Sequence, residues 1–430
     1  MLLQVLVAFF LVSLYNVGVL SIDSSSSLNH TKHLHAVGEE VESLLKWKST
    51  LGSQTRSFLR SWKRSCTANT TSPCKWYGIT CNNKGSVTEL NLTGLNLQGT
   101  LQSFAFSSFA NCVSLDLSNN KLSGFIPPLI RNLSKLTYLD LSMNKFLGHI
   151  PVEVGFLTNM NYLNISQNQI SGPIPSSICN LINLHTLYLS QNQLSGTIPR
   201  NIGKLKFLTG VSLYANNLSG PIPTSLCNLI NLNILYLHIN QLSGSIPNDI
   251  GKLISLTQLD LSENYFVGPI PTSLCNMSHL NILYLFNNVL SGPIPKEIRK
   301  LRSLTDLQLF KNSLTGSIPT SMCNFSNLST LYLYENQLSG YIPREIGKLR
   351  SLTDLRLSAN SLTGPIPTSI YNLSNLNILY LNMNELSGYI LQEIGNLRFL
   401  IDLGLSANNL IGQIPTSICN LSNLDTLHLF

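Results

Sequence analysis

A single motif that recurs in one register through four-fifths of the chain constrains its fold more than any other feature. The unit L-x-x-L-x-L-x-x-N-x-L-x-G-x-I-P-x-x-I-x-x-L-x-x starts at Val87, in a copy that is one residue longer than the rest. It starts again at Cys112 and then at a constant interval to Leu400, which makes fourteen complete repeats before a fragment that begins at Leu424. The ninth position is Asn in thirteen consecutive repeats, from Asn120 to Asn408. This register predicts stacked copies of one structural unit, each stabilised by its neighbours.

The pattern inside the unit predicts its geometry. The apolar residues of L-x-x-L-x-L would point inward from a short strand, and the third, fifth and seventh positions would face outward. Stacked strands would form one long parallel sheet, and the ninth-position Asn would satisfy backbone groups where the chain leaves each strand. The G-x-I-P segment would carry the chain around the opposite side. We therefore predict a solenoid of stacked coils with one long parallel sheet.

Several segments resemble a known family. The L-x-G-x-I-P pattern resembles the plant-specific class of leucine-rich repeats, found in receptor-like kinases, receptor-like proteins and polygalacturonase-inhibiting proteins. Residues 42–51 (ESLLKWKSTL), 59–62 (LRSW) and 73–81 (PCKWYGITC) resemble the N-terminal capping module of that class. The repeats are most similar to those of receptor kinases of the male-discoverer-interacting type. The resemblance implies a leucine-rich-repeat solenoid, which is a right-handed β/α superhelix with a helical N-terminal cap. Its parallel sheet would lie on the concave face and its 3-10 or loop segments on the convex face.

We expect four parts in the chain. Residues 1–21 are a predicted signal peptide, with Val19 and Ser21 as a cleavage pair and an uncleaved anchor as the alternative. Residues 22–86 form an N-terminal segment and the cap, 87–423 the fourteen repeats, and 424–430 a truncated fifteenth. No later apolar run is long enough to span a membrane. Because the sequence stops directly after a strand, we expect a fragment of a longer gene product or a truncated transcript, with any membrane span in the missing C-terminal part.

A secretory chain places its cysteines in an oxidising compartment. Cys74 and Cys81 are predicted to form a disulfide. The cysteines at the twentieth position recur in alternate repeats, about 10 Å apart and so beyond the ~7 Å limit between bonded Cα atoms, which predicts buried thiols. Cys112 is also expected to be buried, and Cys66 has no evident partner. The twentieth-position cysteines are Cys179, Cys227, Cys275, Cys323 and Cys419.

Eleven Asn-x-Ser/Thr sequons are predicted glycosylation sites. Two of them, at the fifth position of repeats one and four, would place glycans on the early part of the concave face and leave the later part bare. The sites are Asn29, Asn69, Asn91, Asn132, Asn164, Asn217, Asn276, Asn324, Asn327, Asn372 and Asn420.

Catalysis, metals and nucleic acids are not predicted. The chain has no phosphate-binding loop, nucleophile elbow, H-E-x-x-H sequence or kinase catalytic loop, so neither an enzyme nor a cofactor is expected. His30, His33 and His35 could contact a metal, but a solvated linker is the favoured interpretation, and we predict no metal site. The net charge is +7, of which residues 87–430 carry only +2, so a basic stripe for nucleic acid is not expected.

The outward positions of the repeats predict a ligand-binding surface. Aromatic residues gather there from the fifth repeat on, with charged residues among them, and such residues are enriched where proteins bind one another. Duplication is the alternative, because Tyr recurs at the fifth position of every second repeat. The candidate residues are Tyr188, Tyr214, Tyr236, His238, Asp260, Tyr284, Phe286, Asp306, Phe310, Tyr332, Tyr334, Asp354, Arg356 and Tyr380, beside Glu263, Lys311 and Glu335.

These observations predict extracellular recognition by the sensing part of a receptor. The resemblance implies a secreted peptide or protein ligand on the concave face, a leucine-rich-repeat co-receptor kinase as a further partner, and a location in the extracellular space or at the plasma membrane. The paired Arg-x-Arg that often reads a peptide's terminal carboxylate is absent, because only Arg356 stands at such a place, after Asp354. Alternatives are a secreted polygalacturonase-inhibitor-like defence protein, a soluble decoy from a truncated receptor gene, or an inert product.

Overall fold

The computed structural model describes residues 37–64 and 72–429. The predicted signal peptide, Cys66, the sequons at Asn29 and Asn69, and the three clustered histidines lie outside the described residues. The described chain forms two units, residues 37–146 and residues 147–429.

The first unit begins with the predicted helical cap. A helix covers residues 37–50 and is followed by α2 (Ser53–Arg56) and η1 (Pro73–Lys75). Val41, Leu44 and Trp47 of the first helix are buried, because their three-residue spacing puts them on one side of the helix. The indole nitrogen of Trp47 donates a hydrogen bond to the carbonyl of Thr100, 2.9 Å away, which fixes the helix against the first repeat.

A disulfide and a buried carboxyl hold the cap to the first strands. Cys74 and Cys81 form a disulfide in the structure, with an S–S distance of 2.07 Å. Strand β1 (Ile79–Cys81) pairs antiparallel with β2 (Val87–Asn91), which covers the edge of the repeat sheet. The carboxylate of Glu40 is 2% exposed and accepts the backbone N–H of Val87 at 3.0 Å. Burial raises the pKa of Glu40 to about 7, only partly opposed by this hydrogen bond.

The remaining elements of the first unit follow the repeat pattern. Strands β2, β4 and β6 pair in parallel, and β3, β5 and the first half of β7 form a second parallel ladder. Each of two 3-10 segments follows a strand of the second ladder and precedes the next strand of the first. The bounds are β3 (Gln98–Thr100), η2 (Phe106–Phe109), β4 (Ser114–Asp116), β5 (Lys121–Gly124), η3 (Pro128–Asn132), β6 (Tyr138–Asp140) and β7 (Lys145–Gly148).

The second unit contains one main parallel sheet, in which each strand pairs with the strand of the next repeat. The register advances by one whole repeat at each step, so that Leu283 lies opposite Leu307. The strands of this main sheet are β8 (Tyr162–Asn164), β10 (Thr186–Tyr188), β12 (Gly210–Ser212), β14 (Ile234–Tyr236), β16 (Gln258–Asp260), β18 (Ile282–Tyr284), β20 (Asp306–Gln308), β22 (Thr330–Tyr332), β24 (Asp354–Arg356), β26 (Ile378–Tyr380), β28 (Asp402–Gly404) and β30 (Thr426–His428).

A second parallel ladder, which the sequence did not predict, runs beside the main sheet. It forms because the L-x-G segment of each repeat is also extended and lies against its copy in the next repeat. Its strands are β9 (Gln169–Pro173), β11 (Gln193–Gly196), β13 (Asn217–Gly220), β15 (Gln241–Ser245), β17 (Tyr265–Gly268), β19 (Val289–Pro293), β21 (Ser313–Gly316), β23 (Gln337–Tyr341), β25 (Ser361–Pro365), β27 (Glu385–Tyr389) and β29 (Asn409–Ile411).

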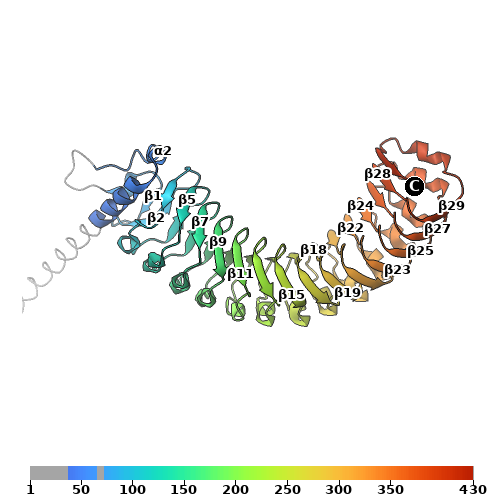
Figure 1. Ribbon diagram of the computed structural model, residues 1–430, viewed down its shortest axis with the longest axis horizontal. Coiled ribbons are helices and arrows are strands. Elements are labelled where there is room, and N and C mark those ends of the chain that lie inside the picture. The colour runs from blue at the N-terminus through green and yellow to red at the C-terminus, as the bar shows by residue number, and fades with distance from the viewer. Residues whose placement is uncertain (1–36, 65–71, 430) are drawn as a thin grey trace, which may run out of the picture. The chain divides into compact units, whose positions relative to one another are not determined.

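Short 3-10 segments complete each coil, as predicted, and we call the surface they form the η side. Within residues 147–429 the main sheet follows the inner side of the bend of this unit, and the η segments follow its outer side (Figure 1). The segments are η4 (Val152–Phe156), η5 (Ser176–Asn180), η6 (Ile202–Lys204), η7 (Thr224–Asn228), η8 (Asn248–Lys252), η9 (Thr272–Asn276), η10 (Lys296–Lys300), η11 (Thr320–Asn324), η12 (Arg344–Lys348), η13 (Thr368–Asn372), η14 (Gln392–Asn396) and η15 (Thr416–Asn420).

The ninth-position asparagines form the predicted hydrogen-bonded ladder. The amide nitrogen of Asn264 donates to the carbonyls of Leu237, Leu261 and Ser262 at 2.9–3.3 Å, and its oxygen accepts the N–H of Leu242 at 3.0 Å. One buried side chain therefore joins its own coil to the preceding one. Each partner is a backbone group that would otherwise lose its hydrogen bond on burial. Because this pattern repeats from coil to coil, it keeps the strands in register.

The predicted buried thiols are present, with one exception. Cys112, Cys179, Cys227, Cys275 and Cys323 are free and buried, and burial raises the pKa of Cys227 and Cys275 to about 11. The prediction was wrong for Cys419, which is free but exposed. It lies in η15, and no further η segment follows to cover it within the described residues.

Candidate functional site

The outward surface of the main sheet, which we call the sheet face, carries all fourteen candidate ligand-binding residues. Each lies in one of the strands from β10 to β26 or directly after it. The third and fifth positions lie within a strand and the seventh lies just past its end, so the three positions form parallel columns across the coils. All fourteen stay partly exposed except Asp260, which is 8% exposed.

The seventh-position column is a stack of aromatic rings. Phe310 stacks on Phe286 at 4.4 Å between ring centroids and on Tyr334 at 4.3 Å, with the planes within 11° of parallel. Tyr214 and His238 form a separate pair at 4.4 Å. Ser262 lies between the two groups and interrupts the column. Parallel strands place equivalent residues one strand spacing apart, and this spacing suits ring stacking.

Tyrosines of the fifth-position column donate hydrogen bonds to the third position of the next coil. The hydroxyl of Tyr284 donates to a carboxylate oxygen of Asp306 at 2.7 Å, and that of Tyr332 donates to Asp354 at 2.5 Å. Burial and the neighbouring carboxylate raise the pKa of both tyrosines, so they stay protonated donors.

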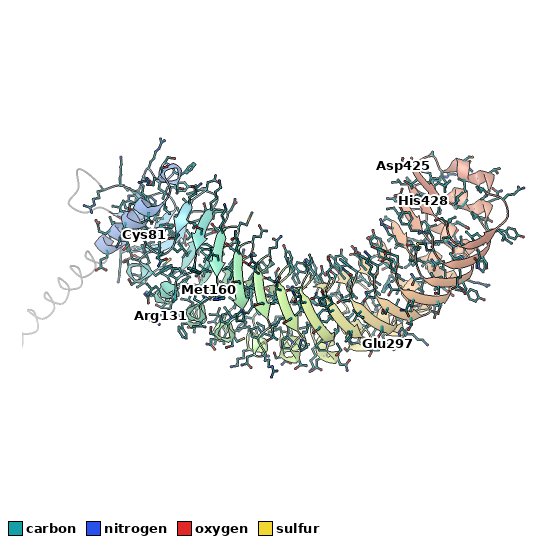
Figure 2. The ribbon with its side chains drawn as sticks, in the orientation of Figure 1. Cys81, Arg131, Met160, Glu297, Asp425 and His428 are labelled. Carbon is teal, nitrogen blue, oxygen red and sulfur yellow. A yellow bond between two sulfur atoms is a disulfide. The ribbon has the colours of Figure 1, made fainter. Side chains whose placement is uncertain are left out.

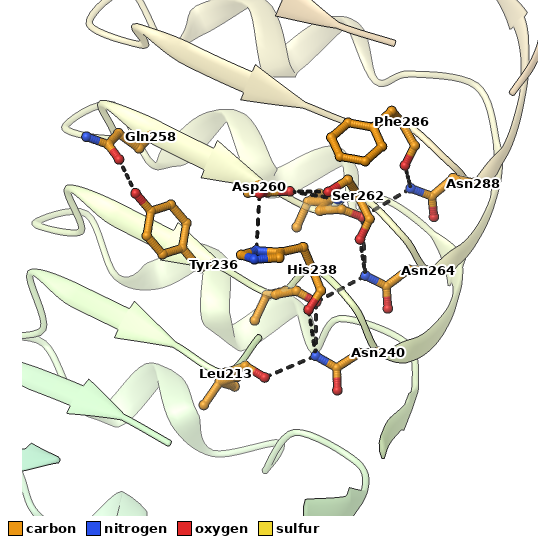
Figure 3. A network of polar contacts seen from close by, with 12 residues as sticks. Leu213, Tyr236, His238, Asn240, Gln258, Asp260, Ser262, Asn264, Phe286 and Asn288 are labelled. Atoms are coloured by element: carbon orange, nitrogen blue, oxygen red, sulfur yellow. Dashed lines mark hydrogen bonds and ion pairs between the residues drawn. The ribbon is translucent and has the colours of Figure 1, made fainter. Parts of the chain in front are cut away.

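Two fifth-position tyrosines outside these pairs have other partners. Tyr236 donates in the same way to the side-chain oxygen of Gln258 (Figure 3). Tyr188 faces Gly210, where a Cβ atom would lie 3.0 Å from its hydroxyl.

Arg356 is held on the sheet face by three side chains. Its guanidinium lies over the rings of Tyr332 and Tyr380, at 4.7 and 5.2 Å from the centroids. Both carboxylate oxygens of Asp354 accept hydrogen bonds from it at 3.1 Å. The charge of Arg356 is thus paired with a carboxylate of its own strand.

His238 and Asp260 form a second polar cluster, drawn in Figure 3. The Nδ1 atom of His238 lies 3.1 Å from Oδ2 of Asp260, although the pair lacks the geometry of a hydrogen bond. Asp260 also accepts the backbone N–H and the hydroxyl of Ser262 at 3.0 and 2.6 Å. Burial lowers the pKa of His238 and raises that of Asp260, and each shift is partly offset by the partner. The imidazole is therefore kept neutral around neutral pH.

The sheet face is acidic between repeats eight and fourteen. Six carboxylates and two cations lie at its outward positions or directly after them, and one of the two cations, Arg356, is already paired. Sequence inspection missed Asp402 and Gln258, although both occupy the third position of a coil that follows a fifth-position tyrosine. The charged residues are Asp260, Glu263, Asp306, Glu335, Asp354 and Asp402 on the acidic side and Lys311 and Arg356 on the basic side.

The structure locates the predicted sugar sites without testing whether they carry sugars. Asn91 ends β2 and Asn164 ends β8, both at the fifth position. Asn217, Asn276, Asn324, Asn327, Asn372 and Asn420 are exposed, while Asn132 is partly exposed.

The described residues offer neither a metal site nor a membrane span. No group of three His, Cys, Asp or Glu side chains within residues 37–64 and 72–429 could hold a metal ion. In the same ranges no helix has the length and apolar character needed to cross a membrane.

Family models match three parts of the chain. A leucine-rich repeat N-terminal domain matches residues 37–82, and a leucine-rich repeat region matches residues 95–243. Single leucine-rich repeats match residues 255–277, 279–301, 327–349 and 351–373.

The chain is also similar to plant receptor kinases and to solved repeat structures. A segment of 103 residues is 48% identical to the Arabidopsis thaliana MDIS1-interacting receptor like kinase 2, covering 24% of this chain and 10% of that protein. The first curated relatives are aligned over only 8–10% of their own length.

The structural comparison covers more of the chain. The ectodomain of the A. thaliana receptor kinase GASSHO1/SCHENGEN3, in complex with CASPARIAN STRIP INTEGRITY FACTOR 2, is 38% identical with a TM-score of 0.78, covering 89% of this chain and 48% of that one. A leucine-rich-repeat protein of Leptospira interrogans is 30% identical with a TM-score of 0.57, covering 78% of this chain and 90% of that one. All regions matched by the family models are repeat or capping modules.

Proposed function

This chain belongs to the leucine-rich-repeat proteins, and from that premise we propose that it is an extracellular recognition module that binds a secreted peptide on its sheet face. Its relatives are plant receptor kinases, and the ectodomain of one of them has been solved in complex with CASPARIAN STRIP INTEGRITY FACTOR 2. The proposal includes a co-receptor kinase as a further partner and a site of action outside the cell.

The observation that carries this proposal is the stacked aromatic column of the sheet face. Phe286, Phe310 and Tyr334 are half-buried by one another, so their rings are ordered before any ligand arrives. Side chains ordered in advance lose little entropy on binding, and large aromatic rings supply much of the energy in protein interfaces. The column is therefore suited to hold an extended peptide.

Duplication explains the fifth-position tyrosines better than it explains this column. Tyr recurs at the fifth position of every second repeat, as a copied pair of repeats would give. At the seventh position His238, Phe286 and Tyr334 follow the same period, but Phe310 does not, since it has Ser262 and Ser358 two repeats before and after it. Phe310, which joins the rings of Phe286 and Tyr334, is therefore the residue that favours selection for binding.

Photocrosslinking from the sheet face tests the proposal. Phe310 is replaced by p-benzoylphenylalanine in the secreted protein, which is irradiated with a panel of synthetic secreted plant peptides that includes Casparian strip integrity factor 2. The matched control carries the same substitution at Phe156, which is exposed in η4 on the η side. We expect a peptide adduct at position 310 and none at position 156. Equal labelling at both positions, or adducts at position 156 alone, would contradict the proposal.

A further inference from the structure

The η side departs from its own pattern at η10. In five other coils the twentieth position is Gly, and a Cβ atom added there would lie 2.0–2.8 Å from a serine carbonyl oxygen of the next coil. Those coils are thus packed as closely as a glycine permits. The ninth repeat has Arg299 at this position. The five glycines are Gly155, Gly203, Gly251, Gly347 and Gly395.

Arg299 lines two pockets of the η side. Because it carries a Cβ atom, η10 cannot approach Ser321 of η11 as closely as the glycine turns approach their serines. One pocket of about 780 Å³ and a second of about 550 Å³ are both lined by Arg299 and Asn324. The hydroxyl of Ser321 still donates to the carbonyl of Lys296 at 2.8 Å, so the two coils remain in register.

The larger pocket is lined by three cations and no carboxylate, whereas the smaller one is lined by Lys296, Arg299 and Lys348 together with Glu297 and Glu345. Arg299, Lys300 and Arg302 line the larger pocket and are exposed, and the described residues contain no ion pair for any of them. Two coils further on, the η12 region adds more cations on the same side. Figure 2 labels Glu297 of η10 on the outer side of the bend of this unit, away from the main sheet. The η10–η12 region holds Lys296, Arg299, Lys300, Arg302, Arg344, Lys348 and Arg350 against Glu297 and Glu345.

From these features we propose that the pockets beside Arg299 bind an acidic polysaccharide whose carboxylates are spaced along an extended chain. Two adjoining basic pockets suit a linear polyanion better than a compact one, and guanidinium groups pair well with carboxylates. Hydroxyl groups between the cations, such as those of Ser278 and Ser326, can hydrogen-bond sugar hydroxyls. Neither pocket is lined by an aromatic ring on which a nucleic-acid base could stack.

The fifth repeat supplies a matched control within the same chain. Arg200, Lys204 and Lys206 occupy its seventeenth, twenty-first and twenty-third positions, as Lys296, Lys300 and Arg302 do in the ninth repeat. The fifth repeat keeps Gly203 at the twentieth position. It therefore presents similar charges with glycine in place of Arg299.

Binding of a galacturonate oligosaccharide, measured by titration calorimetry, tests the inference. The Arg299→Gly variant restores the turn found in five other coils, so we expect it to fold. We expect it to bind the oligosaccharide at least tenfold more weakly, because it loses a charge-assisted contact. The control variant Arg200→Ser/Lys204→Ser/Lys206→Ser should stay within about twofold of the wild type, because lone surface charges contribute little.

Three outcomes would overturn the inference. The first is no measurable binding by the wild type, and the second is an equal loss in the control, which would indicate unspecific attraction. The third is tighter binding of a single-stranded oligonucleotide of equal charge, which would indicate a nucleic-acid surface instead. The site lies on the opposite side from the proposed peptide face, so neither result depends on the peptide-binding proposal.

The predicted glycans supply a second readout. Asn276 and Asn324 both line the larger pocket and both lie in sequons. A large glycan on either would cover the pocket, so the titration uses secreted protein trimmed by an endoglycosidase to the first sugar. We expect the untrimmed protein to bind the oligosaccharide more weakly than the trimmed one. Stronger binding by the untrimmed protein would contradict the location of the site.

Discussion

The sheet face and the η side of repeats nine to twelve share one backbone but carry opposite chemistry. On the sheet face the rings are stacked, and Arg356 is paired with Asp354. On the η side Arg299 and its neighbouring cations have no ion pair within the described residues and stand beside open pockets. A charged side chain that is paired within the protein is held in place by its partner, whereas an unpaired charge is available to a ligand.

The contrast between the two sides also explains why the net charge of the repeats is misleading. Residues 87–430 carry a net charge of only +2, from which no basic surface was expected. Carboxylates on one side of the coils and cations on the other nearly cancel in that sum. In a solenoid the side of the coil on which a charge lies therefore matters more than the sum over the array.

The largest expected effect comes from the structure that both sides share. Replacing Asn264 by Ala leaves three carbonyls and one backbone N–H without their partner, at a cost on the order of 3 kcal/mol in the free energy of unfolding. Urea unfolding followed by circular dichroism measures this loss. The control Asn228→Ala, at an exposed asparagine of η7, should change stability by less than about 0.5 kcal/mol. Equal losses in both variants would mean that the ladder does not hold the coils together.

A smaller effect separates the two sides. Phe310→Ala removes two ring stacks and should lower the free energy of unfolding by roughly 2 kcal/mol. Arg299→Ala removes a side chain with no ion pair within the described residues and should change it by less than about 0.5 kcal/mol. Urea unfolding of both variants in the same buffer measures the difference between their free energies of unfolding. If the arginine variant lost as much stability as the phenylalanine variant, the η side would be as internally bonded as the sheet face.

The smallest effect is a difference in pH dependence. Burial lowers the pKa of His238, so the folded protein binds fewer protons there than the unfolded chain. The stability that neutral His238 contributes is present above the usual value of about 6.5 and is lost as the pH falls below it.

Unfolding midpoints of wild type and His238→Gln between about pH 7.5 and pH 5.5 measure this contribution. We expect the difference between the two proteins to shift against the wild type on acidification, and an NMR titration should place the imidazole midpoint below about 6.5. An unchanged difference, with the midpoint above that value, would show that Asp260 rather than burial controls the imidazole. The nearby charged groups are Asp260 and Glu263.

Periodicity predicted most of the fold, because one unit repeated in register leaves few alternatives. The strand, the ninth-position Asn and the 3-10 turn each follow from residue types at fixed positions. The second ladder was missed, because L-x-G is too short to be recognised as a strand and is extended only when its copy lies alongside. Cys419 was misjudged for a related reason, since its burial depends on a following coil and not on its own position.

The sequence predicted the members of the candidate site but not their contacts. Position alone places Phe286 and Phe310 on one face, yet only the register shows their rings in parallel contact. The bond from Tyr284 to Asp306 joins the fifth position of one coil to the third position of the next, an offset that neither the strand nor the repeat period suggests. The basic pockets were not predicted, because Arg299 is a single residue. Its effect is recognised only when the structure shows how closely the glycines at the same position of other coils approach the next coil.

The alternation of thiol and glycine turns restricts how such an array can change its length. A twentieth-position glycine lies against the serine of the next coil, as with Gly203 and Ser225, and that coil carries Cys at the same position in four cases of five, with Tyr371 in the fifth. Loss of one repeat would bring together two coils of the same kind, whereas loss of two would rejoin unlike coils. Unequal recombination between related genes would therefore add or remove coils in twos, and with them a whole tyrosine of the sheet-face column. The length of the array and the number of its fifth-position tyrosines would then change together.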